Sequence, residues 1–336
     1  MMFTNIKIEG IGIYKPKRTV RNDYFINHFA EKGIEVEALM NHLGRSKRYL
    51  VDKATENSLT MALDASKMAL NNAKISPEEL DGIVFVTNTP EYLMPANSRI
   101  ISNKLGAKNA HFLFDMNNDC IGFISALDIM SSYIKSNPAI NKLLIVSSLN
   151  ISSVASENDP ITYPNVADGS SAVILEKVEE AEEKGVLCSN YFTDSSYYNT
   201  IIGPVCGYSK INDEDVPLEN KKMVWNPFDF SFLSAEWTKL IREMLDTRQL
   251  QPHNVDHYLF SQFSKADIIE TAKKLEVDFN EDNFTYVGDE YGYTGPTSPI
   301  LALYHAVKEN KVKEDSYAVL CSVAAGYTMG SILYKF

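Results

Sequence analysis

An internal repeat is the feature that most constrains how this 336-residue chain can fold. Residues 65–86 and 234–260 each contain an amphipathic helical pattern, a turn with proline, an acidic residue and a β-rich run, in that order. Asp81 in the first stretch corresponds to Asp256 in the second, which places them 175 positions apart (256 less 81). Each half of the chain therefore contains the same helix-to-strand unit.

A second pair of stretches repeats at the same separation. Residues 124–148 and 298–323 each run from a helical pattern into a strand pattern, and the strands begin at Lys142 and Tyr317, again 175 positions apart (317 less 142). Helix–turn–strand units are common, so a chance likeness of two generic units is the alternative explanation. The shared separation favours a duplicated α/β fold.

The length of the chain suits two packed halves. We place the N-terminal half at residues 1–176 and the C-terminal half at residues 177–336, because the charged run 176–185 has the composition of a join. Residues from about 190 to 230 are rich in Tyr, Phe, Asn, Asp and Pro and break the regular pattern. Long loops are often functional, so this insertion is either a lid over a pocket or a surface excursion packed by its own aromatic side chains.

Composition excludes several classes of function. The net charge of −12 argues against nucleic acid as the main partner. No long uninterrupted apolar run occurs, so no membrane span is expected, and the N-terminus lacks the features of a signal peptide, which predicts a cytoplasmic protein. The cysteines form no CxxC pair and the histidines no ligand pattern, so we expect free thiols and no bound metal.

Cys120 lies where a strand pattern ends and a helix pattern begins. Residues 111–116 read as a strand, and residues 122–135 as a helix with one apolar face. A thiol at a helix N-terminus meets unpaired N–H groups and the positive end of the helix dipole, which favour the nucleophilic thiolate. The amide of Cys120 and the turn Ala324-Ala325-Gly326 are candidate donors to an oxyanion. Such junctions also occur as packing alone.

Six motifs, taken in order, carry a family resemblance. They are IKIEGIGIYKPKRTVRN at 6–22, GRSKRYLVD at 44–52, TNTPEYLMPANS at 87–98, DMNNDCIGF at 115–123, ADGSSAVILE at 167–176 and GYTMG at 326–330. Together they resemble the β-ketoacyl-acyl-carrier-protein synthase III family of the thiolase superfamily. The resemblance implies an α/β thiolase fold, with two duplicated halves in five layers, α-β-α-β-α. It also implies that Cys120 accepts an acyl group.

The same resemblance implies partners and substrates. Family members are homodimers, and the loop 87–98 resembles the one that crosses the dimer interface, so Met94 is expected to line the partner's acyl pocket. The expected substrates are acyl-CoA or acyl carrier protein thioesters, with coenzyme A or phosphopantetheine entering as part of the substrate and no permanently bound cofactor. The expected pathway is fatty acid or polyketide biosynthesis.

The sequence departs from the family at two catalytic positions. The family's His-Gln-Ala-Asn segment reads Ser261-Gln262-Phe263-Ser264, and its Tyr-Gly-Asn-Thr segment reads Tyr291-Gly292-Tyr293-Thr294. Ser261 and Tyr293 therefore stand where the resemblance places the catalytic His and Asn, and Gln262 and Thr294 become candidate residues of the substrate pocket. Losing one donor to an oxyanion costs roughly 2.7–4 kcal/mol of transition-state stabilisation. We therefore predict that decarboxylative condensation is weakened.

The sequence also departs from the family at the site that binds the thioester donor. The Trp and Arg that hold the adenine of coenzyme A in the family are absent from residues 38–42, so the pantetheine arm of a carrier protein is an alternative donor. Arg45, Lys47 and Arg48 are expected either to form a basic edge for the donor or to be a solvated charge cluster.

Three functions follow from these patterns. The first is an acyltransferase of the ketoacyl synthase III type, in which Cys120 accepts an acyl group and passes it to an acceptor. The second is a catalytically reduced partner subunit that forms a heterodimer with a homologous synthase. The third is ordinary 3-oxoacyl-ACP synthase III activity with Tyr293 as a hydrogen-bond donor to the enolate.

Overall fold

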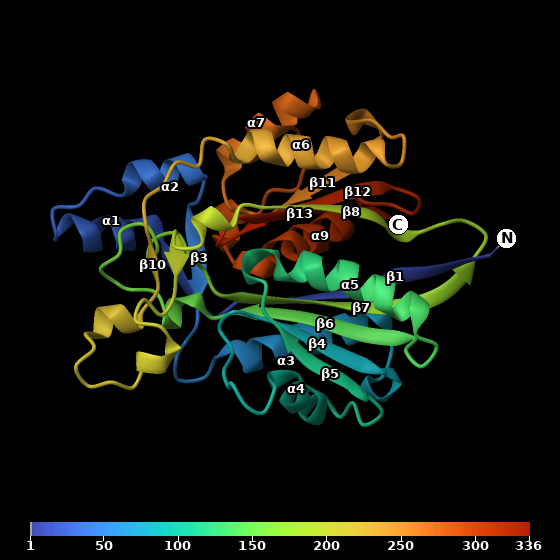
Figure 1. Ribbon diagram of the computed structural model, residues 1–336, viewed down its shortest axis with the longest axis horizontal. Coiled ribbons are helices and arrows are strands. Elements are labelled where there is room, and N and C mark those ends of the chain that lie inside the picture. Colours follow the sequence, from blue (N-terminus) through green and yellow to red (C-terminus); the bar gives the residue numbers. More distant parts are fainter. Residues whose placement is uncertain (1) are drawn as a thin grey trace.

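Two β-sheets, one from each half of the chain, face each other across a layer of two helices (Figure 1). The structure is a computed structural model and describes residues 2–336. Further helices cover the outer face of each sheet, so the layers run α-β-α-β-α (Figure 1). This arrangement confirms the predicted thiolase fold of two duplicated halves in five layers.

The N-terminal half builds a five-stranded sheet. Its strands, in spatial order, are β1 (Phe3–Tyr14), β7 (Gly169–Glu180), β6 (Lys142–Leu149), β4 (Gly82–Val86) and β5 (Phe112–Met116). Strands β4, β5 and β6 are parallel, whereas β7 is antiparallel to both β6 and β1. The helices α3 (Ser58–Ala73) and α4 (Asn97–Leu105) cover the outer face, and α5 (Gly122–Ser136) covers the inner face (Figure 1).

The C-terminal half repeats this plan with four strands. They are β11 (His257–Phe260), β12 (Tyr317–Ala324), β13 (Thr328–Lys335) and β8 (Gly185–Thr193), in that order. The helices α6 (Leu233–Asp246) and α7 (Lys265–Leu275) lie on the outside, and α9 (Ser298–Lys308) lies beside α5 in the middle layer (Figure 1).

The remaining elements gather mostly at one end of the sandwich, on the left of Figure 1. They are α1 (Asn22–Ala30), α2 (Glu37–Leu43), α8 (Gly288–Tyr291), the strand pair β2 (Arg18–Arg21) and β3 (Lys47–Leu50), and the strand pair β9 (Ile201–Ile202) and β10 (Val224–Trp225).

The repeat seen in the sequence is the repeat of the fold. Strands β4 and β11 begin 175 residues apart (257 less 82), and β6 and β12 begin at the same separation (317 less 142). Each acidic residue of the repeat accepts a hydrogen bond from the first residue of the neighbouring strand. The Oδ2 of Asp81 accepts from the backbone N–H of Lys142 at 3.0 Å, and the Oδ2 of Asp256 accepts from that of Tyr317 at 2.8 Å. Each carboxylate fixes the start of one strand against the start of its neighbour.

Helix α5 carries the apolar face that its sequence predicts. The side chains expected on that face are buried between the two sheets, and they are Phe123, Ala126, Leu127, Met130 and Ile134. Burying a side chain the size of Phe, Leu, Met or Ile contributes roughly 1.5–3 kcal/mol. This packing holds the N-terminus of α5 in place, and the candidate nucleophile immediately precedes it.

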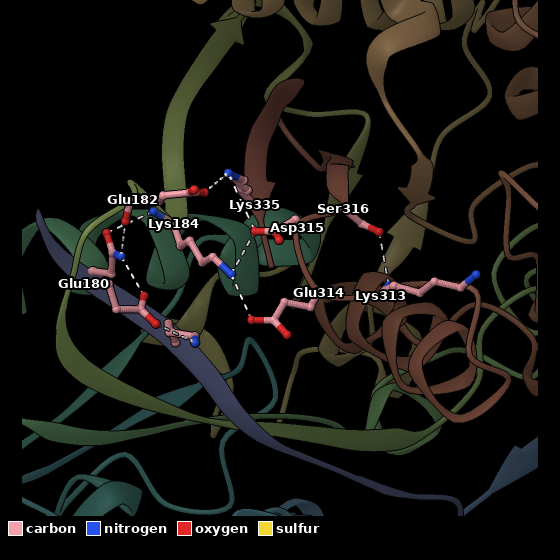
Figure 2. Close-up of polar contacts among 10 residues, drawn as sticks. Glu180, Glu182, Lys184, Lys313, Glu314, Asp315, Ser316 and Lys335 are labelled. Atoms are coloured by element: carbon pink, nitrogen blue, oxygen red, sulfur yellow. Dashed lines mark hydrogen bonds and ion pairs between the residues drawn. The ribbon is translucent and has the colours of Figure 1, made fainter.

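The join between the halves lies slightly later than the predicted boundary at residue 176, because β7 continues to Glu180 and β8 begins at Gly185. Lys184 in the join pairs with Asp315 at 2.9 Å, and Lys335 pairs with Glu182 at 3.1 Å (Figure 2). The carboxylates of these pairs are well exposed, so each pair contributes little stability. They tie the join to the end of the C-terminal sheet.

The repeated aspartates provide a test of the fold. Asp81 accepts from two backbone N–H groups, those of Asn141 and Lys142, whereas Asp256 accepts from one in the equivalent place. We expect Asp81→Ala to lower the free energy of unfolding by roughly 1–2 kcal/mol and Asp256→Ala to lower it by less. Urea unfolding of both variants measures the difference. An equal loss, or a larger loss at Asp256, would contradict this account of the repeat.

Candidate active site

Cys120 sits in a single 3₁₀ turn, Asp119–Ile121, between the end of β5 and the start of α5. Two asparagines shape the approach to this turn: the Oδ1 of Asn117 accepts from the N–H of Asp119 at 3.1 Å, and the Nδ2 of Asn118 donates to the Oγ of Ser125 at 2.8 Å. The turn therefore presents Cys120 at the carboxyl end of a parallel strand, where α/β sheets commonly place ligands.

The C-terminal half supplies the other side of the site. The Oγ of Ser322, on β12, donates to the carbonyl oxygen of Cys120 at 3.1 Å. Cys120 packs against both the core between the sheets and the core under α6 and α7. The nucleophile turn thus lies at the boundary between the halves, and strand ends from both of them reach it.

Ser261 and Tyr293 come together beside Cys120, as the sequence predicts. Ser261 follows β11, and its N–H donates to the carbonyl oxygen of Cys321 at 2.7 Å. The Oγ of Ser261 donates to the Oη of Tyr293 at 3.5 Å, a long bond. The carbonyl oxygen of Tyr293 accepts from the N–H of Ala167 at 2.9 Å, which holds the tyrosine backbone against the N-terminal half.

Gly292 lets the chain make this approach. Its φ of 72° lies in the left-handed region, and a Cβ there would lie 2.8 Å from the Cβ of Arg48 and 2.9 Å from that of Ala167. No other residue type fits both the conformation and the space. The glycine therefore allows the backbone to place Tyr293 in the site.

The Cys120 thiol is neutral at rest, contrary to the thiolate expected from its position at the helix N-terminus. Burial raises the pKa of Cys120 to about 12, and the Asp119 carboxylate acts in the same direction. Hydrogen bonding to the Tyr293 hydroxyl and to the backbone N–H groups of Ala325 and Cys120 lowers the pKa by less than burial raises it. A base is therefore needed to remove the proton during a reaction.

Arg45 lies close to the ring of Tyr293. Burial raises the pKa of Tyr293 well above its usual value, and Arg45 opposes this shift. The guanidinium of Arg45 lies 5.7 Å from the centre of the Tyr293 ring. It donates to the carbonyl oxygens of Asn165, at 2.8 Å, and Phe263, and burial lowers the pKa of Arg45 to about 10.

The predicted basic edge of Arg45, Lys47 and Arg48 is wrong for its two arginines, which are 4% and 0% exposed and form neither a surface for a donor nor a solvated cluster. Lys47 is partly exposed and pairs with Glu290 at 3.6 Å. Arg48 lies with its guanidinium 4.4 Å from the Phe25 ring centre and donates to the Oδ1 of Asn22 at 2.9 Å. Both arginines hold the α1–α2 region against the rest of the chain.

A cavity of about 760 Å³ opens at Cys120. It reaches the surface, because its walls include the well-exposed Leu93, Tyr198 and Tyr208. Its lining is mainly apolar, and the irregular segment 194–232 supplies one wall through Tyr198, Ile201, Ile202, Met223, Trp225, Phe228 and Phe230. The predicted insertion is thus shorter than 190–230 at its start, since β8 continues to Thr193, and it covers a pocket.

The other predicted site residues divide into two groups. Ala325 and Gly326 line the cavity, and the Ala325 amide acts on the Cys120 sulfur. Gln262 does not line it: its amide oxygen accepts from the N–H groups of Val287 and Gly288, so the side chain supports the chain before α8. Gln262 therefore has a structural position and not the predicted place in the pocket.

Met94 and Thr294 also lie outside this cavity. Met94 is 84% exposed on the loop before α4, so it contributes nothing to the pocket of its own chain, and its predicted place in a partner's pocket stays a prediction. Thr294 is buried, with a hydroxyl that has no hydrogen-bond partner, and its methyl group packs near Gly169. Its position next to Tyr293 is structural here.

Two polar residues of the cavity escaped the sequence reasoning. Asp119 precedes the nucleophile, and Asn88 follows β4; the Nδ2 of Asn88 donates to the Oδ1 of Asp119 at 3.3 Å. The sequence contained a signal for both residues, because polar residues that follow parallel strands meet at one edge of a sheet. Among the described residues, no histidine lines the cavity and no cluster has the side chains for a metal. No helix within residues 2–336 has the length and apolar character to cross a bilayer.

The effect of Tyr293 on the thiol is measurable. Because the Tyr293 hydroxyl lowers the pKa of Cys120, we expect Tyr293→Phe to raise that pKa further. Loss of about 1 kcal/mol of thiolate stabilisation would slow iodoacetamide alkylation of Cys120 roughly fivefold at pH 9. Peptide mass spectrometry follows the rate, and Cys206, which does not line the cavity, serves as the internal control. An unchanged or faster rate at Cys120 would contradict the assigned contact.

Comparisons with known proteins agree with this geometry. A model of the family described as 3-oxoacyl-[acyl-carrier-protein (ACP)] synthase III matches residues 114–195, and a model of the C-terminal part of the same family matches residues 245–336. Together they span more than half of the chain and include Cys120, Ser261 and Tyr293.

Similar proteins cover almost the whole chain. The β-ketoacyl-[acyl-carrier-protein] synthase III of Aquifex aeolicus is 29% identical over 333 residues, which cover 98% of this chain and 99% of the relative. The protein of the same name from Ehrlichia canis is 28% identical over 345 residues, with 98% of each chain covered.

Solved structures give the same result. The crystal structure of the Aquifex aeolicus enzyme superposes with a TM-score of 0.84 at 26% identity and covers 98% of this chain and 100% of that one. The priming β-ketosynthase of the R1128 polyketide biosynthetic pathway superposes with a TM-score of 0.88, covering 98% and 96%, and at 21% identity it shows the fold alone. The chain therefore belongs to the 3-oxoacyl-[acyl-carrier-protein] synthase III family, a family of acyltransferases and condensing enzymes.

Proposed function

We propose that this protein takes an acyl group from a coenzyme A or acyl-carrier-protein thioester onto Cys120 and passes it to an acceptor. The observation that carries the proposal is the position of Cys120, whose side chain lies on the wall of a cavity that is largely apolar and reaches the surface. A thioester has a long apolar or amphipathic arm on each side of its carbonyl group, which suits a cavity of this lining and reach.

Acyl transfer to Cys120 needs two kinds of support. The thiol must lose its proton as it attacks, and the carbonyl oxygen must be stabilised as it gains negative charge. The backbone N–H groups of Cys120 and Ala325 already act on the sulfur, so they also lie near the carbonyl carbon that the sulfur attacks. Backbone donors need no reorganisation during the reaction, which is the condition for strong stabilisation of an oxyanion.

The second half of the reaction distinguishes this protein from an ordinary condensing enzyme. Decarboxylation of a malonyl unit places negative charge on a thioester oxygen, and this chain has Ser261 and Tyr293 where the family pattern has His and Asn. Tyr293 lines the cavity, whereas Ser261 is fully buried and does not line it. Neither hydroxyl carries a positive charge, and the two are already hydrogen-bonded to each other. We propose an acceptor that does not depend on decarboxylation.

The cavity favours an enzyme over a catalytically reduced partner subunit. A subunit that serves only to shape a homologue's pocket has no need of an open cavity around its own Cys120. Purified protein separates the two functions: an enzyme acylates Cys120 alone, whereas a partner subunit does so only when its homologue is present, or not at all.

Covalent labelling tests the proposal directly. We expect intact-protein mass spectrometry, after exposure to a panel of acyl-CoA and acyl-carrier thioesters, to show one acyl mass on the wild type. Cys120→Ala should take no label, and Cys206→Ala should take it fully, because Cys206 does not line the cavity. Absence of label with every thioester in the panel would overturn the proposed function.

A second measurement concerns decarboxylation. We expect wild-type protein to release carbon dioxide from malonyl thioesters slowly, because the donors to the enolate are weak. The double variant Ser261→His with Tyr293→Asn restores the family pattern and should raise the rate roughly 10²-fold or more, the effect of a well-placed oxyanion donor. The single variants are the controls. Rapid decarboxylation by the wild type would favour ordinary synthase III activity.

A further inference from the structure

Asp119 is an acidic side chain directly beside the proposed nucleophile. It shares a single 3₁₀ turn with Cys120, and both residues line the same cavity. The negative charge of Asp119 contributes to raising the pKa of the thiol. Asp119 is half-buried, and it has one hydrogen-bond donor from a side chain, the Nδ2 of Asn88 at 3.3 Å. Among the residues that the structure describes, no lysine or arginine pairs with it.

The backbone at Asp119 is in a costly conformation. Its φ of 47° lies in the left-handed region, which non-glycine residues seldom adopt. Aspartate tolerates this region better than most residues, but the conformation is still unfavourable. Strain of this kind persists where the surrounding structure enforces it, and it concentrates at functional sites. Here it holds a carboxyl group next to the cysteine at the wall of the cavity.

Asn88 gives independent support for a polar ligand in this part of the cavity. Its Nδ2 donates to Asp119, whereas its buried Oδ1 has no hydrogen-bond donor among the described residues. A buried amide oxygen without a donor is costly unless something binds it. An acceptor substrate with an N–H or O–H group would satisfy it.

The remaining titratable groups of the cavity do not serve Cys120 in the same way. Glu91 is exposed at the rim, and the Nζ of Lys221 donates to the carbonyl oxygen of Asp213 at 2.9 Å. Tyr293 and Tyr327 also line the cavity, and burial raises the pKa of each hydroxyl, so neither loses its proton at neutral pH. Asp119 is the carboxyl group adjacent to the thiol.

We propose that Asp119 is the general base and general acid of acyl transfer, for an acceptor that reacts through an N–H or O–H group. The inference rests on the proposed function, since it concerns the same cysteine. Burial raises the pKa of Asp119 above its usual value, which makes the carboxylate a stronger base.

The proton balance closes without a further reactant. In acylation the Asp119 carboxylate takes the proton of the thiol as the sulfur bonds to the carbonyl carbon. When the donor's C–S bond breaks, the same proton passes to the departing thiolate. In deacylation Asp119 takes the proton of the acceptor as its nitrogen or oxygen bonds to the acyl carbon. The bond to Cys120 then breaks, and the proton returns to the sulfur.

Asp119→Asn tests this role while keeping the shape and a residue type that tolerates positive φ. With the thioester that labels the wild type fastest, we expect the single-turnover acylation rate at pH 7 to fall roughly 10²–10⁴-fold. The wild-type rate should fall as the pH drops through the raised pKa of Asp119, and the variant should lose this limb. Raising the pH toward the pKa of the thiol should narrow the difference between the two rates, because more of the thiol then ionises by itself.

Glu78→Gln is the matched control, because it removes an exposed carboxyl group that lies outside the cavity. We expect it to keep the wild-type rate and pH profile. Asp119→Gly accepts the backbone conformation and leaves space, so added formate should restore part of its rate in a saturable way, with no effect on Glu78→Gln. This variant also decides the question if Asp119→Asn does not fold.

Two outcomes overturn the inference. One is an Asp119→Asn variant that acylates within about threefold of wild type and keeps the acid limb, against the roughly 10²-fold or larger loss expected. The other is an Asp119→Gly variant that is slow and indifferent to formate. In both cases the wild type still acylates Cys120, so the proposed function stands. If the wild type takes no label at all, the proposed function itself has failed.

Discussion

Burial of one sulfur atom at the boundary between two repeated halves is the constraint on which the rest of this structure depends. Cys120 follows a strand of the first sheet, and its carbonyl oxygen is held by Ser322 on a strand of the second. Cys120 is partly buried, and this burial raises the pKa of the thiol. Where water is displaced, hydrogen bonds strengthen, so backbone donors that contribute little in water become more effective. The reactivity of the thiol therefore depends on groups placed within hydrogen-bond distance.

The absence of histidine from the cavity changes how a proton can move. An imidazole titrates near neutral pH and both gives and takes a proton easily. Burial raises the pKa of Tyr293 well above its usual value, so its hydroxyl gives hydrogen bonds and does not act as a base. Arg45 is buried near the ring, and its positive charge opposes the rise in the pKa of Tyr293. The tyrosine hydroxyl can therefore donate a hydrogen bond but cannot remove a proton. Proton removal needs a different side chain, and a carboxylate is suited to it.

The sequence predicted the parts of the fold that depend on local pattern, and it failed where distant segments decide. The repeat and the apolar face of α5 follow from periodicity, whereas the roles that bring Cys120, Ser261 and Tyr293 to one site were implied by the family resemblance. Gln262 is different: it lies in the turn after β11, and its side chain binds the backbone before α8 while that of Ser261 binds Tyr293. The burial of Arg45 depends on carbonyl oxygens more than 100 positions away, a long-range effect that no local pattern reveals.

The loop before α4 shows why this cavity need not be complete within one chain. Tyr92, Leu93 and Met94 are 51%, 62% and 84% exposed, an apolar run that water solvates poorly. Leu93 also lines the rim of the cavity, so the exposed run is continuous with the site. A surface that covered this loop would narrow the entrance and remove water from Cys120 at the same time. A homodimer, which the family resemblance implies, would provide such a surface, and its assembly would then exclude water from the site of acyl transfer.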